Sequence, residues 1–125
     1  ANAATFVLAS ATVVVDAIDS VPAKAELLAR AAAAGVPVAS AMGAANRMDP
    51  TAFRVVDLAE TSGDGLARAL RSELRARGLD LHGPCVLSSE PPAKLVPPGS
   101  LVTVTAAAGL ILAQAALDLI WEKSK

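Results

Sequence analysis

The sequence has few large side chains and few of the residues that build disulfides or metal sites. Of its 125 residues, two are phenylalanine, one is tryptophan and none is tyrosine, and cysteine and histidine occur once each. A single cysteine excludes a disulfide within the chain and suits a reducing compartment. Because the chain has one histidine, His82, and one cysteine, neither a zinc site nor a serine–histidine pair is indicated. The core must therefore be built from small aliphatic side chains.

An excess of charge of one sign is also lacking. Eleven basic residues oppose 12 acidic ones, and the net charge of −1 gives no overall field that attracts nucleic acid. We see no basic segment followed by an apolar run, the pattern of a signal peptide, and expect a cytoplasmic protein. The long apolar run at residues 101–120 is interrupted by threonines, a glutamine and Asp118. We therefore expect a buried helix there and no membrane span.

A strand, a helix and a second strand are indicated near the start of the chain. Residues 12–18, TVVVDAI, are typical of a strand that is buried on both faces. Pro22 fits the first turn of a helix, and Gly35 is a plausible end for it. Residues 36–43 indicate the second strand. The short links between these elements predict a βαβ unit of a parallel sheet.

The rest of the chain continues the alternation of strands and helices. We expect the tail of a helix at 2–9, a strand at 52–60, an amphipathic helix at 63–78, a strand at 85–90, a proline-rich loop at 91–100 and a last helix from about 106 to 121. The fold class is therefore α/β, a mixed, mostly parallel sheet flanked by helices. No glycine-rich phosphate loop of either common type occurs, so we expect the second half of a larger domain.

Six sequence blocks, in order, carry a resemblance to a known family. They are VVVDAIDS, MDPT, VVDLAET, the LARALRSELRARG helix, VLSSE and PPGSLVTVTAAAGLILA. The chain resembles the ThiF/MoeB/HesA superfamily of ATP-dependent adenylating enzymes, and within it the tRNA threonylcarbamoyladenosine dehydratase branch. The resemblance implies the C-terminal half of a Rossmann-like ThiF-type fold, a homodimer, and a missing N-terminal half that carries the nucleotide-binding glycines. The isolated chain is then expected to be inactive.

The first block, VVVDAIDS, places two carboxylates, Asp16 and Asp19, at the carboxyl end of a buried strand. Open α/β sheets bind their ligands outside the carboxyl ends of the strands. The resemblance implies that Asp19 is the carboxylate essential for adenylation and that it holds Mg²⁺ beside ATP. The backbone at Ala17 and Ile18 would pass close to the nucleotide. Asp16, deeper in the strand, could orient the loop by hydrogen bonding instead of touching metal. Spacing alone favours Asp19 as the N-cap of the following helix. With Asp19 assigned to the metal by the resemblance, Ser20 can supply the cap.

Basic side chains supply further candidates. Lys24 matches a basic position in the family's helix and could reach the phosphates, although a solvated lysine is the commoner case. Arg47, in the loop AMGAANRMDP, is the candidate contact for an anionic substrate. Arg68 and Arg71 share a helix face and could follow the phosphates of a tRNA. The alternative for this pair is a solvated helix face.

Three functions remain open at this point. The first is activation of the threonylcarbamoyl carboxylate on tRNA, which the branch resemblance implies. The second is activation of a sulfur-carrier or ubiquitin-like protein, the related activity in the superfamily. It usually comes with zinc-binding cysteine pairs or a transferable cysteine, whereas Cys85 fits a buried strand position. The third is a non-catalytic domain that binds a partner through its sheet edge and alanine-rich helices. The sequence favours the first.

Overall fold

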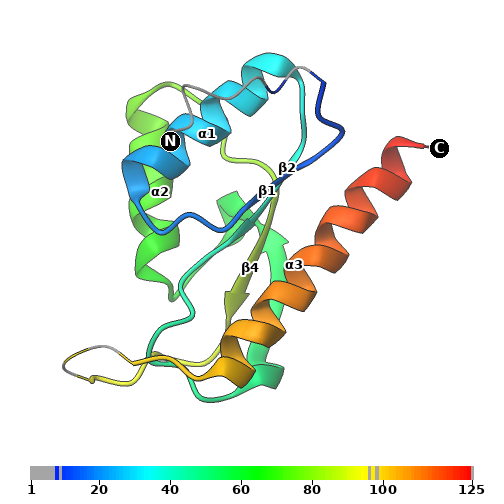
Figure 1. Ribbon diagram of the computed structural model, residues 1–125. Coiled ribbons are helices and arrows are strands. Elements are labelled where there is room, and N and C mark those ends of the chain that lie inside the picture. The colour runs from blue at the N-terminus through cyan, green and yellow to red at the C-terminus, as the bar shows by residue number, and fades with distance from the viewer. Residues whose placement is uncertain (1–7, 9, 96, 98, 125) are drawn as a thin grey trace.

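Three layers make up the fold, with one sheet between two helices on one side and a long helix on the other (Figure 1). The computed structural model describes residues 8, 10–95, 97 and 99–124. In chain order the elements are β1 (Val14–Asp16), α1 (Val21–Ala34), β2 (Val38–Ala41), a 3₁₀ turn η2 (Pro50–Ala52), β3 (Phe53–Asp57), a 3₁₀ turn η3 (Leu58–Glu60), α2 (Gly65–Ala76), β4 (Pro84–Ser88) and α3 (Val102–Lys123).

The four strands that the structure describes form one mixed sheet in the order β1-β2-β4-β3. β1 pairs with β2 and β2 with β4 in parallel, and Asp16 lies opposite Ser40. β3 pairs with β4 in the antiparallel sense, with Val55 opposite Val86. The mixed, mostly parallel sheet and the βαβ unit that the sequence predicts are confirmed. β1 has a neighbour on one side only among the described strands.

Helices α1 and α2 cover one face of the sheet. Helix α1 carries Pro22 in its first turn and ends at Gly35, whose φ of 69° is the left-handed conformation that favours glycine. The fully buried residues of α2 include Leu70 and Leu74, one turn apart. The core on this face consists of small and aliphatic side chains from α1, α2 and the sheet: Ala25, Met42, Leu58, Ala67, Leu70, Leu74, Cys85 and Leu87.

Helix α3 crosses the opposite face of the sheet (Figure 1). Its buried positions, Val104, Ala108, Leu112 and Ala115, recur every three or four residues and pack on Val86 and Phe53. The other side of α3 is apolar and exposed, and Leu110 is 74% exposed and Trp121 66%. By length and composition, α3 could cross a membrane, and 28% of its most apolar window is buried. The helix is thus covered on one side only.

Two element boundaries and the burial of one strand residue differ clearly from those expected. Helix α3 begins at Val102, not near residue 106, because Val104 is fully buried against the sheet and this packing extends the helix into a β-branched stretch. The strand expected at 52–60 ends at Asp57, whose side chain accepts from the N–H of Ala59 and starts the turn η3. Val15 in β1 is half exposed instead of buried. The helix expected at 2–9 falls on residues of which only Leu8 is described.

Candidate functional site

The candidate residues gather at one edge of the sheet. Because β1, β2 and β4 are parallel, their carboxyl ends lie at the same edge, which open α/β sheets use for ligands. The loop at 17–20 follows β1, and the loop at 42–49 follows β2. The proline-rich segment follows β4 and is joined to the second loop at Asn46, which accepts from the backbone N–H of Ala93 and pairs with the backbone of Gly99. The edge is therefore built by three connected loops.

A buried ion pair lies at the base of this edge. Lys24 Nζ is 2.8 Å from Asp16 Oδ2, and neither side chain is exposed. The same ammonium group donates to the carbonyl oxygens of Ile18, at 2.9 Å, and Ala41, at 2.7 Å. Asp16 Oδ1 accepts from the N–H of Ile18. The expectation that Asp16 orients the loop by hydrogen bonding agrees with this geometry. A contact between Lys24 and phosphate stays a prediction, and it would require the ammonium group to leave three internal partners.

Asp19 stands apart from this pair. Its side chain is exposed and, among the described residues, has no hydrogen bond or ion pair. The N-cap of α1 is Ser20, and its side chain forms no capping bond. The capping alternative for Asp19 is therefore wrong in this structure, as is the idea that the Ser20 hydroxyl supplies the cap. Ala17 is exposed beside it. Within the described part of the chain, Asp19 is thus a carboxylate at this edge whose oxygens are not engaged.

Arg47 is buried at this edge and bonds to other residues of the protein. It is 4% exposed, and its guanidinium group donates to the carbonyl oxygens of Ser88, the last residue of β4, and of Glu90, which follows β4. It also lies 3.4 Å from Asp64 Oδ2. Asp64 in turn accepts from the N–H of Gly43 at 3.1 Å and caps α2 through the N–H of Ala67 at 2.9 Å. A contact between Arg47 and substrate stays a prediction. Asp64 is the residue that sequence reasoning missed, although its place before an apolar helical run is an N-cap signal.

Arg68 and Arg71 lie in the first two turns of α2, near this edge. They line a shallow hollow of about 260 Å³ together with Gly63, Asp64 and Gly65. Arg68 is exposed, whereas Arg71 donates to the carbonyl oxygen and the hydroxyl group of Thr61. One arginine is therefore free for an anionic ligand, and the other is partly occupied.

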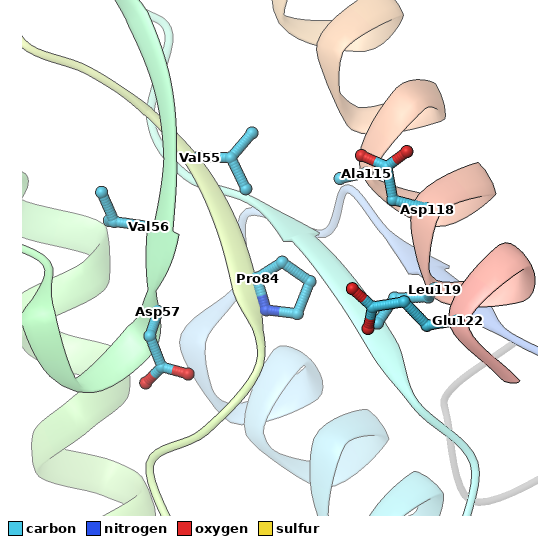
Figure 2. A pocket seen from close by; sticks show the side chains of 8 residues that line it. All are labelled: Val55, Val56, Asp57, Pro84, Ala115, Asp118, Leu119 and Glu122. Carbon is cyan, nitrogen blue, oxygen red and sulfur yellow. The ribbon is translucent and has the colours of Figure 1, made fainter. Parts of the chain in front are cut away.

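A separate hollow of about 340 Å³ opens at the opposite edge of the sheet, between β3 and α3 (Figure 2). Val55 and Pro84 face the end of α3, which carries Asp118 and Glu122, while Val56 turns away. At its margin Asp57 has a lowered pKa: burial, which would raise it, is outweighed by bonds from the N–H groups of Ala59 and Gly83 and by His82. Within the described part of the chain, no group of three or more histidine, cysteine or acidic side chains could hold a metal ion.

Cys85 has the buried strand position expected from the sequence. It lies in β4, and burial raises the pKa of its thiol to about 12. His82 is 77% exposed in a loop. Among the described residues, neither side chain forms a nucleophile–base pair.

Comparison with known proteins now adds to this geometry. No protein-family model matches the chain. Over 88 residues, 67% of the chain, it is 44% identical to tRNA threonylcarbamoyladenosine dehydratase 2 of Saccharomyces cerevisiae, of which the match covers 20%. Over 118 residues, 79% of the chain, it is 32% identical to the Bacillus subtilis tRNA threonylcarbamoyladenosine dehydratase, of which 46% is covered. The chain is a sequence relative of these dehydratases.

The fold agrees with the sequence comparison. The solved structure of TcdA (CsdL) superposes with a TM-score of 0.88 and 33% identity, over 98% of this chain and 54% of that one. The Escherichia coli tRNA N6-threonylcarbamoyladenosine dehydratase in complex with AMP gives a TM-score of 0.80 and 32% identity, over 91% of this chain and 50% of that one. The same enzyme has also been solved with ATP. The chain therefore has the Rossmann-like fold of these enzymes and spans about half the length of the relatives, or less.

Proposed function

We propose that this chain is the C-terminal half of a tRNA threonylcarbamoyladenosine dehydratase, which activates the threonylcarbamoyl carboxylate on tRNA with ATP so that it can cyclise with loss of water. The observation that carries the proposal is an exposed carboxylate, Asp19, which has no partner among the described residues and lies at the carboxyl edge of a sheet whose fold matches dehydratases solved with AMP and ATP. The edge is held by buried ion pairs, which leaves this carboxylate available for ligand.

The residues of this edge fit a Mg²⁺–nucleotide complex in one specific way. Mg²⁺ is usually bound through one or two carboxylates together with phosphate oxygens. Asp16 is already paired with Lys24, so Asp19 is the carboxylate that can supply a metal ligand. ATP would supply the adenylyl group that turns a carboxylate oxygen into a better leaving group. The backbone at Ala17 and Ile18 would lie beside the nucleotide, and the exposed Arg68 would meet a substrate phosphate.

The partners follow from the same proposal. Among the described strands, β1 has a neighbour on one side only, and a strand of the missing N-terminal half would cover the other side. The exposed apolar side of α3 would pack in the assembled protein, as a homodimer, instead of in a membrane. The tRNA would approach the edge that carries Arg68 and Arg71. A tRNA-modifying role and a single buried cysteine both suit the cytoplasm.

The test is ATP–pyrophosphate exchange by the full-length protein that contains this chain. We expect exchange that depends on tRNA bearing threonylcarbamoyladenosine, with loss of one water from the modified base by mass spectrometry. Unmodified tRNA is the matched control and should give no exchange. Exchange driven by a sulfur-carrier protein in place of tRNA would assign the chain to the related activity. No exchange with either substrate would leave an interaction domain and contradict the proposal.

A further inference from the structure

We propose that the buried Asp16–Lys24 pair is the positioning device for the Asp19 loop, and that it couples this loop to the end of β2. In this role both side chains act through the backbone, and Lys24 keeps its internal partners instead of turning to a phosphate. This inference rests on the proposed function for its catalytic consequence, while its structural part can be tested without any activity.

The two charged side chains hold both backbone polar groups of one residue. Asp16 Oδ1 accepts from the N–H of Ile18 at 3.0 Å, and Lys24 Nζ donates to its carbonyl oxygen at 2.9 Å. Ile18 immediately precedes Asp19 in the chain. With its N–H and its carbonyl both fixed, Ile18 sets the direction in which the chain enters Asp19, although the Asp19 side chain itself has no partner among the described residues.

The same ammonium group reaches a third segment. Lys24 Nζ donates to the carbonyl oxygen of Ala41, the last residue of β2, at 2.7 Å. The next residue, Met42, is bonded to β4 through its N–H. One buried ammonium group thus connects the loop after β1 with the residue at which the loop after β2 begins, and both loops belong to the candidate site. The ammonium group forms an ion pair with one carboxylate and donates hydrogen bonds to two carbonyl groups, and methionine in its place could do neither.

The burial of both charges favours a role in positioning the Asp19 loop over a role in stability. Replacing a buried ion pair by neutral groups is often neutral or stabilising, so a pair that is 0% exposed on both sides is weak evidence for a gain in stability. What the pair does provide is fixed geometry, since charge-assisted hydrogen bonds are short and directional. A carboxylate that must meet a metal ion and a phosphate needs its backbone held to within about 0.5 Å.

The experiment uses the full-length protein and the double variant Asp16→Ala/Lys24→Met. Alanine removes the acceptor of the Ile18 N–H, methionine removes the donor to the Ile18 and Ala41 carbonyl groups, and no charge is left unpaired, so the variant should fold. The control is Glu26→Gln, which lies two residues further along α1 and breaks only an exposed pair with Arg77. The readouts are hydrogen exchange at the Ile18 amide and the kcat and KM of pyrophosphate exchange.

We expect the amide of Ile18 to exchange at least tenfold faster in the double variant, because its acceptor on Asp16 is gone. We also expect kcat to fall at least tenfold while the KM for ATP changes less than threefold. The control should match wild type in all readouts. Unchanged amide exchange, or full kcat in a folded double variant, would overturn the inference. If the double variant does not fold, Asp16→Glu, which keeps the charge and shifts the carboxylate by one methylene, must show the same effects.

A wild-type protein without pyrophosphate exchange would contradict the proposed function and leave this inference to the amide readout alone. Faster exchange at Ile18 would then still support the positioning role, and unchanged exchange would still exclude it.

Discussion

Lys24 Nζ lies 2.8 Å from Asp16 Oδ2, and both side chains are completely buried at the base of the candidate site. The two residues come from different elements, the end of β1 and the first turns of α1. The pair accounts for a strand that ends in two carboxylates. The first carboxylate is paired inside the protein and accepts from the N–H of Ile18, and the second, Asp19, is exposed.

Lys24→Met alone should destabilise the protein by about 3 to 5 kcal/mol, because it leaves the Asp16 carboxylate buried without a partner charge. Urea denaturation followed by circular dichroism measures the change. Glu26→Gln on the same helix should change stability by less than about 1 kcal/mol, since its pair with Arg77 is exposed. Equal losses in the two variants would mean that the buried pair has no special role.

Asp19→Asn should lower pyrophosphate exchange in the full-length protein by about 100-fold, the size of effect typical for loss of one electrostatic contact to a transition state. The fold should be unaffected, because Asp19 is exposed and has no partner among the described residues. Asp80→Asn, an exposed acid in the loop before β4, is the control and should keep full exchange. Pyrophosphate exchange by the Asp19→Asn variant at the wild-type rate would show that Asp19 takes no part in adenylation.

The Cys85 thiol should not react with alkylating reagents in the native protein at pH 8, because burial raises its pKa to about 12 and the thiolate is the reactive form. The raised pKa also links to stability. The folded state holds the thiol proton more tightly than the unfolded state does. The contribution of the protonated thiol to the free energy of unfolding is therefore complete below the pKa of cysteine in the unfolded chain, about 8.5. It is lost as the pH rises from there toward 12.

Denaturation curves from pH 8 to 11 test this linkage. Wild type should lose stability faster than Cys85→Ala over that range, and the two should run in parallel below pH 8. Rapid alkylation of the native protein would show that β4 opens or that the thiol is accessible.

The elements were predictable from the sequence where the signals are local. Residues 13–41 carry a β-branched run, a proline at the start of a helix and a glycine at its end, and the structure confirms the strand–helix–strand unit. The start of α3 was not predictable, because Val102, Thr103 and Thr105 are poor helix formers and burial of Val104 against the sheet decides it.

The environments of the charged residues were harder to predict. The sequence shows that Lys24 and Arg47 are basic, but their burial depends on partners that only the fold brings close. Lys24 meets Ala41, 17 residues away, and Arg47 meets Ser88, 41 residues away. A charged side chain is rarely buried unless it is paired, and sequence spacing does not reveal such a pair. Asp19 needed no distant partner, and its exposed position followed from its place at the strand end.

The exposed side of α3 should drive self-association of the isolated 125-residue chain. Val102, Leu110, Leu117 and Trp121 follow one another along that side, and each is more than half exposed. A continuous apolar stripe of this length is typical of an interface. Light scattering should therefore give a dimer or larger particle in place of a 12.5 kDa monomer. Leu110→Glu, in the middle of the stripe, should shift the particle to a monomer, because association would bury an unpaired carboxylate. Ala69→Glu adds the same charge on exposed α2 and should leave the particle unchanged. A wild-type chain that stays monomeric at high concentration would show that this stripe does not hold a second copy.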